Sequence, residues 1–194
     1  MVLTHLEMSL KLNQETKDSL KLNQETKDYL HEVSLEEFVS YLVNAEIVMK
    51  LDGRDYWELA NNEVKSTVLK WKKQIKNIPV IDYLEGMLDA INDLIVNHKE
   101  IVEWDMISIP PLGFRLEKTK GVIVIGVVHF PSWSGNGIFH QIGRVTEKEL
   151  LESILLCGSQ FIREIVSLND QLRFLDSIKE LQTRLDNLEK FGII

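Results

Sequence analysis

The chain has only one cysteine, Cys157, among its 194 residues. A single cysteine cannot form a disulfide within the chain, which excludes a disulfide-stabilised scaffold and is typical of a reducing compartment. Apolar neighbours at helical spacing, in the sequence LLESILLCGSQFIREIV, predict that Cys157 is a small buried side chain. The sequence therefore offers no reason to assign this thiol a chemical role.

Long apolar runs are also missing. The longest, Val122 to Val128, contains Gly126 and is far shorter than the roughly 20 residues of a membrane-spanning helix. The first residues, MVLTHLEMSLKLNQ, lack the basic and apolar regions of a secretory signal. We therefore expect a cytoplasmic protein with no membrane partner.

The sequence also lacks the short motifs that mark known catalytic and ligand-binding sites. The sequence contains no P-loop, no HExxH pair and no nucleophile elbow, so it predicts no catalytic residue, no cofactor and no metal ligand. The formal net charge of −8 makes a nucleic-acid partner an unfavourable interpretation, because affinity for phosphates comes from lysine and arginine. This charge suits a solvated acidic surface or a basic partner instead.

The N-terminus contains a perfect repeat: residues 9–18, SLKLNQETKD, recur as residues 19–28. On one helix the two copies would lie about 80° out of phase, so their equivalent leucines would not share a face. The repeat therefore indicates a duplication in the coding sequence. In the structure, we expect this duplication to have lengthened a helix by additional turns. We expect residues 1–33 to be a helical N-terminal extension, and deletion of residues 9–18 to leave the thermal midpoint nearly unchanged.

Helices are expected over most of the N-terminal half. A capping box over Ser34 to Glu37 begins a helix that should end at Asp52-Gly53. A second helix, starting near Trp57, should end at Pro79. A third should follow over Ile81 to Ile95, where apolar residues recur every three or four positions.

The pattern then changes to that of strands. Leu112, Phe114 and Leu116 alternate with polar residues or glycine, and residues 121–128 are rich in β-branched side chains. Together with residues 138–145 they predict a small antiparallel three-stranded sheet. The expected fold class is therefore α+β, with a single α+β domain over residues 34–170.

The C-terminal part should again be helical. A second capping box, from Thr146 to Glu149, begins a long helix. A coiled-coil-like seam follows, formed by Phe174, Ile178, Leu181, Leu185 and Leu188. This stripe either folds back on the N-terminal helices or makes residues 171–194 the interface of a homodimer.

The segment HFPSWSGNGIFH, from His129 to His140, predicts a hairpin that brings two histidines together. If its loop centres on Ser134-Gly135, the two residues form a directly opposed pair with Cβ atoms about 4.5–5.5 Å apart. Three interpretations remain open: structural histidines, a ligand-binding pair, or part of a metal or catalytic site. A metal site needs a third ligand, for which the distant His98 is one candidate.

The tip of this hairpin has the composition of a contact surface. Trp133 is a residue type enriched among interface anchors, and it lies among Ser132, Ser134 and Asn136, which tolerate tight turns and form hydrogen bonds. We therefore expect these four residues to bind a partner, with His129 and His140 as the alternative, ligand-binding site.

Two functions follow as hypotheses. The first is a small, non-catalytic protein that inhibits or neutralises a partner protein, as immunity proteins, antitoxins and phage-encoded inhibitors do. It depends on the acidic charge, the absent motifs and the tryptophan at the hairpin tip. The second is an enzyme or small-ligand binder whose pocket lies at the His129/His140 end of the sheet.

Overall fold

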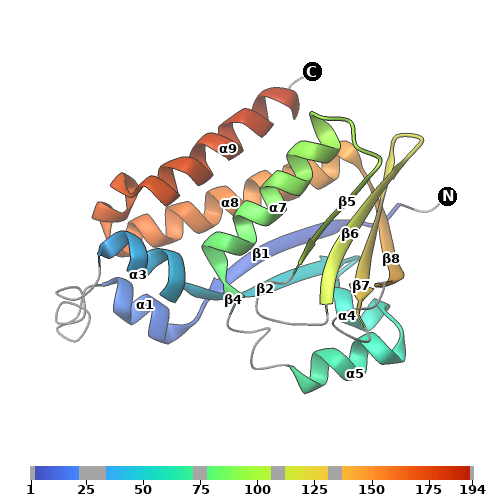
Figure 1. Ribbon diagram of the computed structural model, residues 1–194, viewed down its shortest axis with the longest axis horizontal. Helices are drawn as coiled ribbons and strands as arrows, with labels where there is room; N and C mark the ends of the chain where they lie inside the picture. The colour runs from blue at the N-terminus through green and yellow to red at the C-terminus, as the bar shows by residue number, and fades with distance from the viewer. Residues whose placement is uncertain (1–2, 22–33, 72–77, 106–111, 131–136, 193–194) are drawn as a thin grey trace.

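The computed structural model of the chain describes residues 3–21, 34–71, 78–105, 112–130 and 137–192. Within these ranges the fold is α+β, with seven α-helices and two four-stranded antiparallel sheets (Figure 1). One hydrophobic core includes residues of both sheets and of the long helices. The expected α+β class is confirmed, but the single three-stranded sheet is wrong, because part of the N-terminal half forms a second sheet.

This second sheet consists of β1 (Leu6–Leu12), β2 (Asn44–Leu51), β3 (Arg54–Asp55) and β4 (Ile78–Pro79). Its two long strands, β1 and β2, pair antiparallel, and every second residue of each is buried. Such a two-residue period is that of a sheet with one face on the core. Asp52 and Gly53 have positive φ and form the turn to β3, so the helix expected to reach this turn ends earlier. It is α3 (Leu35–Leu42), which keeps the predicted capping box.

Within residues 3–21, the N-terminal segment is not the wholly helical extension that the repeat suggested, because it contains β1. The first repeat copy spans the end of β1 and most of α1 (Gln14–Leu20), whose N-terminal N–H groups are capped by Asn13. Leu10, Leu12 and Thr16 of this copy are buried, and β1 packs against α8 (Glu147–Leu168). This copy is therefore part of the core. From residue 22 to residue 28 the second copy lies outside the described residues.

The other sheet contains β5 (Ile101–Asp105), β6 (Leu112–Thr119), β7 (Val122–His129) and β8 (Ile138–Thr146), in chain order. The three strands expected from the sequence are confirmed, and β5 was missed. Lys120 and Gly121 have positive φ at the β6–β7 turn, where glycine was expected. In Figure 1 this sheet stands at one end of the molecule.

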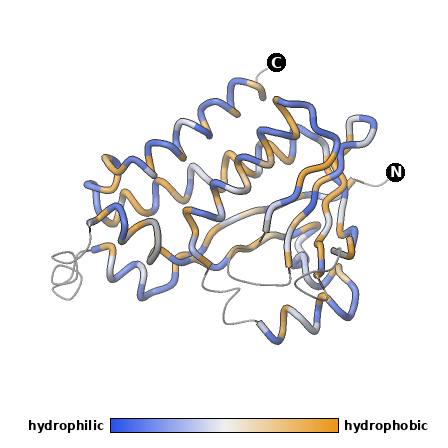
Figure 2. The backbone as a smooth tube through the Cα atoms, in the orientation of Figure 1, coloured by the Kyte–Doolittle hydropathy of each residue, from blue (hydrophilic) through white to orange (hydrophobic). Residues whose placement is uncertain are grey.

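Three long helices complete the fold: α7 (Val80–Ile95), α8 and α9 (Asp176–Gly192), with a 3₁₀ turn, η1 (Asp170–Phe174), before α9. They lie side by side (Figure 1) and contact one another. Hydrophobic and hydrophilic residues alternate along α8 and α9, as expected for helices with one buried face (Figure 2). In the described residues, no helix has the length and apolar character that crossing a membrane requires.

The predicted apolar seam on α9 packs against other helices of the same chain. Ile178, Leu181, Leu185 and Leu188 are all buried, whereas Phe174 is exposed and does not take part. Leu185 packs so closely on Gly158 of α8 that a Cβ atom there would lie 2.8 Å from the leucine Cδ2. A homodimer through residues 171–194 that used this stripe would therefore require α9 to separate from α8.

A short helix pair, α4 (Tyr56–Leu59) and α5 (Asn62–Lys70), lies where the sequence predicted a single long helix starting near Trp57. The break occurs at Ala60 and Asn61, where the Asn61 side chain accepts a hydrogen bond from the Val64 N–H and caps α5. Tyr56 packs edge-on against Phe114 of β6, with ring centroids 5.2 Å apart. This contact holds the helix pair against the sheet β5–β8.

Candidate metal centre

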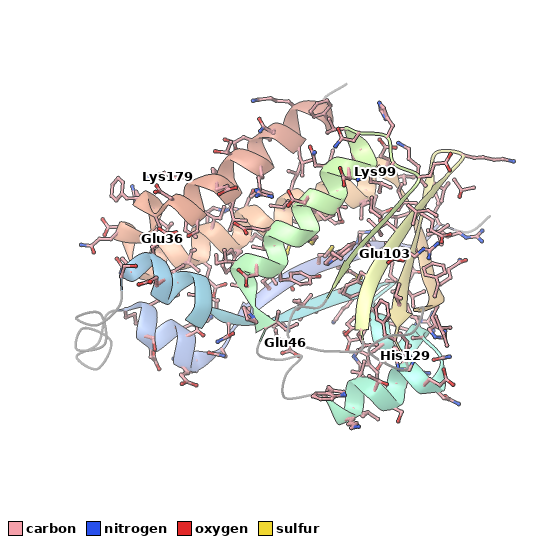
Figure 3. All side chains as sticks on the ribbon, in the orientation of Figure 1. Glu36, Glu46, Lys99, Glu103, His129 and Lys179 are labelled. Atoms are coloured by element: carbon pink, nitrogen blue, oxygen red, sulfur yellow. The ribbon has the colours of Figure 1, made fainter. Side chains whose placement is uncertain are left out.

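Three potential metal ligands from distant parts of the chain converge at the end of this sheet. They are Glu63 on α5, His129 at the end of β7 and His140 on β8. One carboxylate oxygen and one nitrogen of each imidazole all lie within 4.8 Å of one another. Figure 3 shows His129 beside α5. Metal–ligand bonds of about 2.0–2.2 Å place two ligand atoms at most about 4.4 Å apart, so the three side chains would have to draw closer together around an ion.

The strand register brings the two histidines to the same face of the sheet. His140 lies opposite Val127, and His129 lies opposite Ile138, so the expected direct opposition of the two histidines is wrong by two residues. Because side chains alternate with a period of two, a two-residue difference preserves the face. The histidines are therefore diagonal neighbours.

A β-bulge in β8 determines which face His140 occupies. Ile125 lies opposite Gly143 but Gly126 lies opposite Gln141, so Ile142 is an extra residue in this ladder. If the register of Ile125 continued, His140 would lie opposite Val128 and would point to the other face. The bulge thus places His140 on the face that carries His129.

Contacts from the N-terminus hold the strand at the bulge. The Thr4 N–H donates to the Arg144 carbonyl at 2.7 Å, and the Arg144 N–H donates to Thr4 Oγ1 at 3.0 Å. A Cβ atom on Gly143 would lie 2.8 Å from Thr4 Oγ1 and 2.9 Å from Leu51 Cδ2. Glycine is therefore what allows the two sheets to approach each other here.

Helix α5 carries the third candidate ligand, Glu63. Val64 and Val68, four residues apart, are buried and fix the rotation of the helix. Glu63 and Thr67 have the same spacing and lie together beside that buried stripe. Glu63 is exposed, while His129 and His140 are partly buried, so the centre lies at the surface end of the sheet.

The hydrogen bonding of the two imidazole rings is incomplete among the described residues. His129 Nε2 lies 3.3 Å from Thr67 Oγ1. His129 Nδ1 and His140 Nε2 are buried from solvent and have no hydrogen-bond partner among the described residues. A buried polar atom without a partner costs about 1–3 kcal/mol, and a metal ion at this point would remove that cost.

No protein-family model, curated protein or solved structure matches the chain. The candidate metal centre is therefore supported by the geometry and chemistry of these residues alone.

Other residues singled out from the sequence are not part of this cluster. His98 follows α7 near Ile101, which lies opposite Glu117, whereas His129 lies opposite Leu112 at the other end of β6. His98 is therefore not the third ligand. The predicted partner-binding residues Ser132, Trp133, Ser134 and Asn136 lie outside the described residues.

Sequence reasoning missed Glu63. It is one of several acidic residues on surface helices, and its spacing to the histidines carries no signal, because 65 residues separate it from His129. Only the packing of Tyr56 on Phe114 and of α5 beside β7 brings Glu63 close to the two histidines.

Among the described residues, the cluster offers two nitrogens and one oxygen, a set that suits Zn²⁺, Fe²⁺ or Co²⁺ better than Mg²⁺ or Ca²⁺, which prefer oxygen ligands.

Proposed function

We propose that the protein binds a divalent transition-metal ion through Glu63, His129 and His140. The observation that carries this proposal is the approach of three ligand atoms to within 4.8 Å of one another. Two buried nitrogens, His129 Nδ1 and His140 Nε2, have no hydrogen-bond partner among the described residues, and this supports the proposal. It develops the sequence hypothesis of a ligand-binding site at the His129/His140 end of the sheet.

The ligand set favours an open metal centre. Structural zinc sites usually have four protein ligands, whereas catalytic zinc sites have three and keep a position for water or substrate. The described residues supply three, and Glu63 lies at the exposed side. An ion bound here would act as a Lewis acid on a water molecule or small ligand in the remaining position.

Inhibition of a partner protein remains a separate prediction. Its proposed contact residues, centred on Trp133, lie outside the described residues, so no contact in the described part of the chain favours it. The metal centre is consequently the function that the geometry supports best.

Zinc affinity of the tag-free protein, measured by competition with a chromophoric chelator, tests the proposal. We expect one zinc ion per chain. Glu63→Gln, His129→Gln and His140→Gln should each weaken binding by at least the roughly 10–100-fold typical of changes outside the ligand set. Glu58→Gln and His98→Gln are matched controls outside the cluster and should bind as the wild type does.

Two results would contradict the proposal. One is the absence of stoichiometric binding by folded wild-type protein for zinc, cobalt and iron(II) alike. The other is equal loss of affinity in the cluster variants and in the controls, which would assign the metal to nonspecific surface sites.

A further inference from the structure

His129 has two ring nitrogens in different surroundings. Nε2 lies 3.3 Å from the hydroxyl oxygen of Thr67, and Nδ1 is buried without a hydrogen-bond partner among the described residues. A neutral imidazole carries one proton, and only the nitrogen without it can bind a metal ion. The identity of the ligand atom therefore depends on which nitrogen finds a hydrogen-bond acceptor.

We propose that Thr67 is a positioning residue that accepts the Nε2–H of His129 and thereby commits Nδ1 to the metal ion. This inference rests on the proposed function. Metal-binding histidines commonly donate their second ring N–H to a protein oxygen, which fixes both tautomer and ring orientation. The Thr67 hydroxyl is the oxygen that the structure places at Nε2.

The position of Thr67 on α5 strengthens the argument. It follows Glu63 by four residues, so both project from one side of the helix. A single rigid element thus carries one ligand of the ion and the group that orients another. The neighbouring buried residues Val64 and Val68 hold this helix face against the core, so the spacing between the two groups is fixed by packing.

Two substitutions separate the hydroxyl from the shape of the side chain. Thr67→Val keeps the branched shape and removes the acceptor, whereas Thr67→Ser keeps the acceptor. We expect the valine variant to bind zinc about 10–100-fold more weakly than wild type, in the range seen for loss of such partners. The serine variant should stay within about threefold of wild type, because its hydroxyl can still accept the N–H.

Nitrogen-15 NMR of the histidine rings gives a second readout that a purely structural role of Thr67 would not move. In zinc-loaded wild-type protein, we expect Nε2 of His129 to carry the proton and Nδ1 to show the metal-bound shift. The same spectrum remains decisive if Thr67→Val fails to fold, because it needs only the wild-type chain.

The outcomes are distinguishable. If folded wild-type protein binds no metal ion, the proposed function fails and this inference fails with it. If wild type binds but zinc is attached through Nε2 of His129, or Thr67→Val binds as tightly as wild type, only the role of Thr67 is overturned.

Discussion

His140 lies directly opposite Val127 in the β7–β8 ladder, and Val127 lies opposite Phe114 in the β6–β7 ladder. Phe114 in turn packs against Tyr56, the first residue of the helix pair that carries Glu63. This chain of contacts links a candidate ligand on a strand to a candidate ligand on a helix through buried residues. The geometry of the centre is therefore set by the core of the protein.

Glu36 of α3 caps the N-terminus of α9, and its removal should destabilise the fold. Its two carboxylate oxygens accept the Asp176 and Ser177 N–H groups at 2.9 and 2.8 Å. Loss of a capping group typically costs about 1 kcal/mol, so Glu36→Ala should lower the free energy of unfolding by about that amount in urea denaturation. Glu58→Ala, at an exposed position of α4, is the control and should change it little. Equal effects of the two substitutions would refute the capping role.

Removal of one repeat copy should leave the fold intact. Deleting residues 9–18 or residues 19–28 yields the same polypeptide, because the copies are identical. The remaining copy then completes β1 and α1, and Leu30 follows it in the place that Leu20 occupies now. We expect the thermal midpoint to shift by no more than the roughly 2–4 °C that 1 kcal/mol represents in a chain of this size.

A buried-leucine substitution checks this interpretation of the repeat. Leu12→Ala should cost about 2–5 kcal/mol, as such truncations do in a core, in both the full chain and the single-copy variant. If the single-copy variant is unfolded, or if Leu12→Ala does not lower its free energy of unfolding, the remaining copy does not rebuild the strand.

Cys157 should be unreactive in the folded protein. Burial raises the pKa of its thiol to about 12, and the side chain is only 2% exposed. Because the thiolate is the reactive form, a higher pKa leaves the protonated thiol dominant at pH 8. Modification by a thiol-specific dye should then be on the order of 1,000-fold slower than in denatured protein, given an ordinary thiol pKa near 8.5. Comparable rates in the two states would contradict this assignment.

Local patterns predicted the strands β6, β7 and β8 well, since alternation and a glycine turn act over few residues. The second sheet was missed for a physical reason. β1 lies partly in the repeat, which suggested a helix, and the alternation of β2 follows directly on a genuine helix with a capping box. Both segments become strands because β1 pairs with β2, whose residues lie about 40 positions further along the chain. The sequence pattern of one strand does not show which distant segment it will pair with.

The candidate centre was predictable only in part. The sequence symmetry of the hairpin correctly indicated that His129 and His140 approach each other, but its register was wrong because the strands close with His129 opposite Ile138. Neither the bulge at Ile142 nor the contribution of Glu63 has a local signature. Both depend on how Gly143 and α5 pack against other elements.

X-ray absorption at the zinc edge of the zinc-loaded protein tests the central claim most directly. The account predicts two imidazole nitrogens at about 2.0–2.1 Å and a carboxylate oxygen at about 2.0–2.2 Å, with one imidazole lost in His140→Gln. A zinc shell without imidazole, or an unchanged shell in His140→Gln, would contradict it.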